Sequence, residues 1–277
     1  MKATAIVLST AGALLAAGLL GAVVVVYSGA YNVGATSQHL QPVHSLLETA
    51  MRQSVRWRAR DIAAPPLDDA QRVQRGAALF HGKCVQCHGA PGVAQADFGQ
   101  SMQPVPGPLV DAPQRWRPQE IYWITRHGIK MSGMPAWEFK LEESQLWDVV
   151  AFVQTLPDLS PQAYAQATRD AGAPPPRADV APLRTGDVDR GKLALGQYAC
   201  QACHTIPGIT SSSPHVGPPL KGLASRSLIA GKLANTPDNL VLWVRDPKAV
   251  KPLTAMPDMN VSELDARDMA AYLATLH

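Results

Sequence analysis

The sequence lacks a strong charge of either sign. Its 277 residues include 25 Lys and Arg against 22 Asp and Glu, which leaves a formal net charge of +3. A balance so mild does not indicate a nucleic-acid partner. The length is enough for about two domains.

Cysteine is also scarce, and no cysteine is left over. The four cysteines form two C-x-x-C pairs, each followed directly by a histidine; the six residues are Cys84, Cys87, His88, Cys200, Cys203 and His204. Zinc sites built from two such pairs keep them within about 20 residues, whereas these lie 116 residues apart. A thioredoxin-like pair needs neither the histidine nor a second copy. C-x-x-C-H is typical of covalent c-type haem attachment, with two thioethers and an iron-ligating histidine, so we expect two haem c groups.

Charged residues are missing between Lys2 and Glu48, and residues 3–27 are almost wholly apolar. At about 1.5 Å per residue this stretch can cross a hydrocarbon core of ~30 Å. A cleaved signal peptide is the alternative, since Ser28 and Ala30 would suit a cleavage site, but its apolar part runs only about 7 to 15 residues. We expect residues 1–28 to be a retained anchor. Lys2 then lies inside, which places the rest of the chain in the bacterial periplasm, beyond a single pass through the inner membrane.

Residues 29–66 are predicted to connect the anchor to the rest of the chain. Within them, apolar side chains recur at helical spacing over 42–62; they are Val43, Leu46, Leu47, Met51 and Val55. One interpretation is a connector helix lying at anionic lipid headgroups. The other is a docking helix for a membrane partner.

The sequence after residue 64 contains an internal repeat with two copies. "RGAALFHGKCVQCH" (75–88) matches "RGKLALGQYACQACH" (190–204), and the closing helices "WDVVAFVQTL" and "RDMAAYLATL" align without gaps. This repeat predicts two domains, 67–158 and 187–277, joined by an extended linker over the Pro- and Ala-rich residues 159–186.

Each repeat has too little continuous apolar sequence for a large core, so the haem is expected to supply much of it. Gly76 and Gly191 occur where an opening helix could let the closing helix approach closely, against Phe152 or Tyr272. The alternative is that these glycines only fray a helix end. Ser262, with Asp265 three residues on, is expected to cap the second closing helix.

The sixth iron ligand is expected to be a methionine, because a thioether opposite the histidine completes the coordination and raises the potential. Met134 and Met256 are each followed by proline, near the end of their repeats. The rivals weighed are Met131 and Met259, which lack the proline, the histidines His127 and His215, and Met102 and Met269, which fit packing roles.

The second repeat resembles the class I cytochrome c family in "CQACHTIPGITSSSPHVGPPLKG" and "NLVLWVRDPKAVKPLTAMP". By that likeness the Pro218 carbonyl would accept a hydrogen bond from the His204 ring, Trp243 would lie near a haem propionate, and Met256 would ligate iron. The first repeat departs from the family pattern, because "PVPGPL" (104–109) stands where the Gly-Pro turn is expected. The acceptor for His88 is then open among Pro104, Pro106 and Pro108.

The resemblance implies an all-α fold of two tandem class I cytochrome c domains behind a transmembrane helix. The chain as a whole resembles the anchored dihaem cytochromes that accompany proteobacterial haem-copper oxidases. The implied function is one-electron transfer towards a terminal oxidase, with a quinol-cytochrome c reductase, a soluble cytochrome or a cupredoxin as further redox partners. The alternatives are the electron-accepting subunit of a periplasmic dehydrogenase and a dihaem peroxidase, which the paired Met-Pro motifs disfavour.

Overall fold

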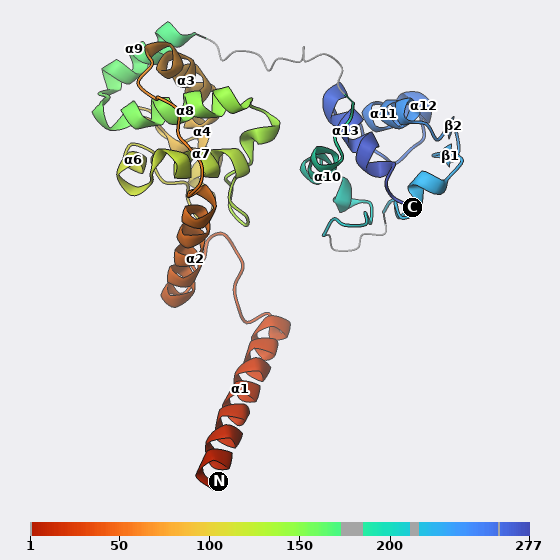
Figure 1. Ribbon diagram of the computed structural model, residues 1–277, viewed down its shortest axis with the longest axis horizontal. Helices are drawn as coiled ribbons and strands as arrows, with labels where there is room; N and C mark the ends of the chain where they lie inside the picture. The colour runs from red at the N-terminus through yellow and green to blue at the C-terminus, as the bar shows by residue number, and fades with distance from the viewer. Residues whose placement is uncertain (1, 173–184, 211–215, 260) are drawn as a thin grey trace. The chain divides into compact units, whose positions relative to one another are not determined.

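The computed structural model of the protein describes residues 2–172, 185–210, 216–259 and 261–277. These residues form two units, Met1–Pro175 and Pro176–His277. Helices dominate both units (Figure 1). The strands in the described ranges are β1 (Leu228–Ile229) and β2 (Leu233–Ala234), which pair antiparallel. The predicted all-α class is confirmed.

Helix α1 (Lys2–Ser28) is exposed along its whole length. Within the described part of the chain it is the helix that is long and apolar enough to cross a membrane. A helical signal sequence near an N-terminus can meet the same two criteria. These two properties therefore make α1 a candidate membrane span.

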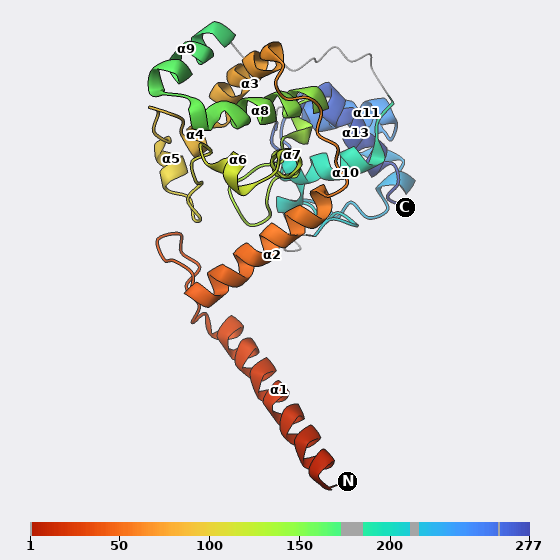
Figure 2. The same ribbon diagram turned by 60° about the vertical axis from the view of Figure 1, so that its left-hand side comes forward.

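Helix α2 (Gln41–Ala59) covers most of the predicted helix 42–62 and leads into the first domain (Figure 2). Val55 and Ala59 are buried where α2 packs on α7 (Pro118–His127). Leu46 and Trp57, which lie 11 residues apart and so share a helix face, are 69% and 66% exposed. The amphipathic helix therefore packs one face on the first domain and leaves an apolar face in solvent.

The core of the first domain is a crossing of α3 (Ala70–Lys83) and α8 (Glu143–Thr155) (Figure 1). A Cβ on Gly76 would lie 2.0 Å from the Asp148 carbonyl oxygen, so only glycine allows the helices to approach this closely. Arg75 holds the buried Asp148 carboxylate at the same crossing, with an Nε–Oδ2 distance of 2.8 Å. The other elements of this domain are α4 (Val85–His88), α5 (Asp97–Gln100), α6 (Ala112–Arg115) and the 3₁₀ turns η1 (Trp137–Phe139) and η2 (Leu156–Asp158).

The predicted linker begins too early. Residues Pro161–Ala171 form helix α9, which packs on α3 (Figure 2). The Ser160 hydroxyl caps this helix and Pro161 occupies its first turn, both favourable helix starts. Tyr164 on α9 is 1% exposed and packs against Phe80, so this part of the predicted linker belongs to the first domain. Residues 173–184 of the linker lie outside the described residues.

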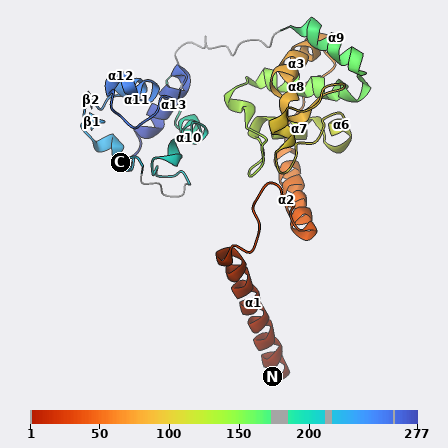
Figure 3. The ribbon, with the colours of Figure 1, turned by 180° about the vertical axis from the view of Figure 1, so that it is seen from behind.

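The second domain repeats the crossing with α10 (Val188–Gln197) and α13 (Glu263–Leu273) (Figure 3). A Cβ on Gly191 would lie 1.9 Å from the Asp268 carbonyl oxygen, one turn before the expected contact at Tyr272. Ser262 caps α13 as expected, accepting a hydrogen bond from the Asp265 backbone N–H. The other elements are the 3₁₀ turns η3 (Cys200–Ala202) and η4 (Leu223–Ser225) and the helices α11 (Pro237–Arg245) and α12 (Pro247–Val250).

Candidate haem sites

Each C-x-x-C-H motif folds into a single helical turn. Helix α3 ends at Lys83, Cys84 caps it, and α4 follows at once, with the backbone N–H of His88 bonded to the Cys84 carbonyl at 3.0 Å. In the second domain the N–H of His204 bonds to the Cys200 carbonyl at the same distance. Residues three apart on such a turn face the same side. Both cysteines and the histidine of each motif are thus presented together.

All four cysteines are free thiols in the structure. The first cysteine of each motif, Cys84 or Cys200, packs against its domain core. Burial raises the pKa of Cys84 to about 12 and that of Cys200 to about 11. Both thiols are therefore protonated at neutral pH.

The His88 ring is oriented by a backbone carbonyl. Its Nδ1 lies 2.8 Å from the Gly107 oxygen, and because a carbonyl can only accept, Nδ1 carries the hydrogen. Burial lowers the pKa of His88, an effect that the Gly107 hydrogen bond partly opposes. Burial therefore favours the neutral ring, whose Nε2 is left as a metal ligand.

The acceptor at His88 is none of the three prolines considered from the sequence. Aligning "VPGPL" (105–109) with "VGPPL" (216–220) places Gly107 opposite Pro218. The order of glycine and proline is reversed between the repeats, but the acceptor is the backbone carbonyl of the same position. The Gln95 side chain also ties this loop to the motif by donating to the carbonyls of Cys87 and Pro106.

The His204 ring has the partner expected from the resemblance. Its Nδ1 lies 2.8 Å from the Pro218 carbonyl oxygen. Gly217 packs against the ring, since a Cβ there would lie 2.5 Å from the His204 Cε1 atom. The Gly217 N–H also bonds to the Cys203 carbonyl at 2.8 Å. In the first domain the Gln95 side chain donates instead to the equivalent Cys87 carbonyl. The Gly-Pro pair thus positions the imidazole from two directions.

A cavity of about 650 Å³ opens beside His88. Of the residues that line it, His88, Gln95 and Gln100 have polar side chains and the others are apolar or glycine. Its volume lies within the range of roughly 300–1,000 Å³ for cofactor sites. No three His, Cys, Asp or Glu side chains among the described residues gather as a metal cluster. The donors and the cavity fit a c-type haem better than a bare zinc ion.

Met134 and Met256 lie in equivalent loops. The backbone N–H of each bonds, at 3.2 Å, to a hydroxyl two residues earlier, on Ser132 or Thr254. The Met134 loop is also fixed by Gly128, where a Cβ would lie 2.6 Å from the Met134 carbonyl oxygen. Met134 is not among the residues that line the cavity beside His88. Their ligation of iron stays a prediction.

The structure places the rival ligands as follows. Met131 is 99% exposed and Met259 is 41% exposed, whereas Met269 is fully buried in the second core. Met102 contacts Gly133, and His127 pairs with Glu138 at 3.3 Å. His215 lies outside the described residues. Trp243, on α11, is half-buried against the core of the second domain.

Comparisons with known proteins match one segment in each domain to a family model. Residues 71–153 match the family model described as "Cytochrome C oxidase, cbb3-type, subunit III", and residues 188–277 match that of cytochrome c. A "Cytochrome c oxidase subunit 2" from Alkalihalophilus pseudofirmus is 32% identical over 92 residues, which cover 32% of this chain and 25% of that protein. Cytochrome c domains imply c-type haem and electron transfer, and the family model matched by the first domain is that of a cbb3-type oxidase subunit. The chain therefore contains two cytochrome c domains, the first of the cbb3-type subunit III kind and the second of class I.

Proposed function

We propose that the protein is a membrane-anchored dihaem cytochrome c that carries single electrons in the periplasm to a haem-copper terminal oxidase, as its subunit or close partner. The duplicated site supports this proposal most strongly. In each domain, one helical turn presents two cysteines and a histidine whose Nδ1 bonds to a backbone carbonyl. Helix α1 serves as the anchor, and its exposed apolar surface supports this role.

Two haem groups would be held covalently. Cys84 and Cys87 would bind the first and Cys200 and Cys203 the second. The iron ligands would be His88 with Met134, and His204 with Met256. A bound c-type haem supplies reversible one-electron chemistry. The chain's residues would position the imidazoles and, with a histidine and a methionine on each iron, leave no coordination position for a substrate.

The oxidase is favoured over a dehydrogenase as the partner. The first domain matches the cbb3-type subunit III model, and the relative from Alkalihalophilus pseudofirmus is also an oxidase subunit. No comparable observation supports a dehydrogenase subunit. The electron donor would be a quinol-cytochrome c reductase, a soluble cytochrome or a cupredoxin.

Reoxidation kinetics test this function. The full-length protein is reduced, stripped of reductant and mixed by stopped flow with a purified cbb3-type oxidase in aerobic buffer. We expect loss of the reduced haem absorption within the turnover time of the oxidase, and cyanide, as the control, to prevent it. Reoxidation at the same rate with and without the oxidase would overturn the assignment.

A further inference from the structure

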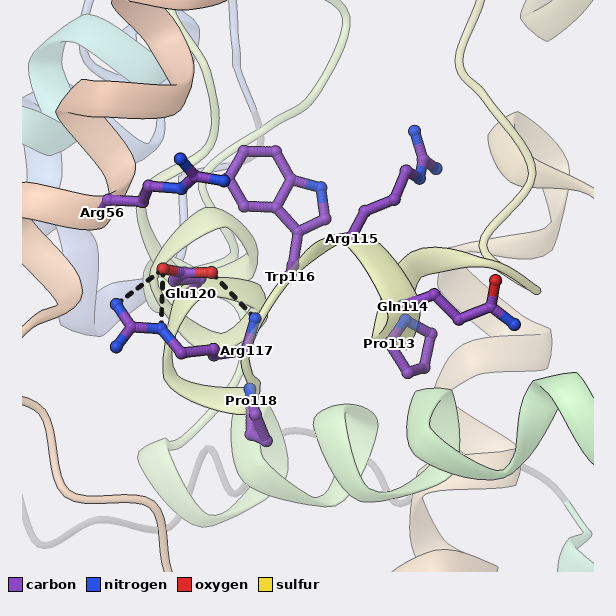
Figure 4. Close-up of a pocket in the computed structure, with 8 residues that line it drawn as sticks. All are labelled: Arg56, Pro113, Gln114, Arg115, Trp116, Arg117, Pro118 and Glu120. Atoms are coloured by element: carbon purple, nitrogen blue, oxygen red, sulfur yellow. Dashed lines mark hydrogen bonds and ion pairs between the residues drawn. The ribbon is translucent and has the colours of Figure 1, made fainter.

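An open hollow of about 490 Å³ lies in the first domain, apart from the haem motif (Figure 4). It is formed where α2 meets α6 and the start of α7. The residues that line it are Arg56, Pro113, Gln114, Arg115, Trp116, Arg117, Pro118 and Glu120. None of them belongs to the proposed haem sites, so the hollow has no role in electron transfer as derived above.

The hollow is positively charged. Three arginines and one glutamate line it, and Asp111 beside it pairs with Arg115, so one positive charge is uncompensated. The Glu120 carboxylate is buried and already engaged, because Arg117 donates to it from Nε at 3.0 Å and from Nη2 at 2.8 Å. This carboxylate is thus neutralised by its own neighbour and does not repel an incoming anion.

Arg56 is the cation that is free to bind. Within the described residues it makes no hydrogen bond or ion pair, whereas Arg115 pairs with Asp111 at 2.8 Å. Figure 4 shows the Arg56 side chain pointing from α2 towards the side of the hollow where Trp116 lies. The site therefore combines an unpaired guanidinium with apolar walls from Trp116 and two prolines.

The same helix that contributes Arg56 follows the candidate membrane span. Residues 29–40 separate α1 from α2, and a chain of that length reaches at most about 43 Å. Nearer the span, Leu46 and Leu47 of α2 are 69% and 54% exposed. Exposed apolar residues and arginines on one helix are typical of a helix at the headgroup layer.

We propose that this hollow binds the phosphate group of an anionic phospholipid. Arg56 contacts the phosphate, while Trp116 and the prolines pack against the apolar part of the headgroup region. A guanidinium suits phosphate oxygens because its N–H groups form a planar fork. The inference rests on the membrane anchoring in the proposed function and is independent of the electron transfer.

The test measures lipid binding to the detergent-solubilised, full-length holoprotein by native mass spectrometry. Phosphatidylglycerol is titrated against the unaltered protein, Arg56→Gln and the control Arg58→Gln. The control removes the same charge from the same helix, at an exposed residue that bonds only to Ser54. Phosphatidylcholine and inorganic phosphate are titrated separately.

We expect one phosphatidylglycerol per chain, with binding weakened about tenfold or more in Arg56→Gln and unchanged in Arg58→Gln. Phosphatidylcholine should bind more weakly than phosphatidylglycerol. Equal loss in both variants would reduce the effect to general charge and overturn the site. Displacement of the lipid by equimolar inorganic phosphate would identify a free-phosphate site and overturn the lipid as the occupant. Haem spectra and reoxidation, recorded on the same samples, report separately on the proposed function.

Discussion

Gly76 and Gly191 allow the long helices of each domain to cross closely because they carry no side chain at the crossing point. We predict that Gly191→Ala destabilises the second domain by about 1–3 kcal/mol or more, because the new Cβ must displace the backbone of Asp268. Gly196→Ala is the control, since it lies in the same helix with nothing within 4 Å of a Cβ. It should be neutral or stabilising by up to about 1 kcal/mol. Calorimetric unfolding checks both, and equal melting temperatures would contradict the prediction.

Met256 is predicted to be the axial ligand of the second haem. Met256→Ala should leave that haem covalently bound, since both cysteines remain, while removing its half of the methionine-to-iron absorption and lowering its reduction potential. Met259→Ala, which changes a methionine three residues on, is the control and should leave both unaltered. Spectroelectrochemistry measures the band and the potential together. An unchanged band in Met256→Ala would show that the wrong methionine was chosen.

The sequence was most informative where the chemistry needs a particular side chain. Cysteine, histidine and the glycines of the helix crossings could be identified because few other residues can replace them. Gly107 could not, since it acts through a backbone carbonyl that any residue would supply. Gln95 was missed for a related reason: its side chain replaces a backbone donor that the second domain takes from Gly217.

At the scale of elements, α9 adds an aromatic contact to the first core. Tyr164 packs against Phe80 and Phe152 at ring distances of 6.4 and 6.2 Å, and its hydroxyl lies 3.0 Å from His81 Nδ1. We predict that Tyr164→Ala lowers the stability of the first domain by about 3–5 kcal/mol, whereas Gln162→Ala, an exposed change on the same helix, has no effect. Calorimetry that finds the two variants equal would remove α9 from the core.

The opening and closing helices were predictable because each carries a long apolar pattern and has a counterpart in the other repeat. Helix α9 follows the first repeat, and its proline and alanine content resembles that of a linker. Its helical state depends on burying Tyr164, which is a tertiary effect. The packing of α2 on α7 is also a tertiary contact, and the apolar pattern of α2 alone is equally consistent with a lipid surface.

At the scale of the molecule, the two domains have separate cores. We predict that Cys200→Ala combined with Cys203→Ala halves the haem content and unfolds the second domain, because the haem supplies much of its interior. The first domain should keep its haem spectrum and its melting transition. Haem stoichiometry and calorimetry test this. A second domain that stays folded without haem would contradict the claim that haem completes its core.

We propose that both domains hold a six-coordinate haem with histidine and methionine ligands. Optical and magnetic circular dichroism spectra of the oxidised and reduced protein, with haem content per chain, test this coordination. We predict two low-spin c-type haems per chain, each with a methionine-to-iron charge-transfer band. One high-spin haem, or one without that band, would contradict the claim and open a coordination position for a substrate.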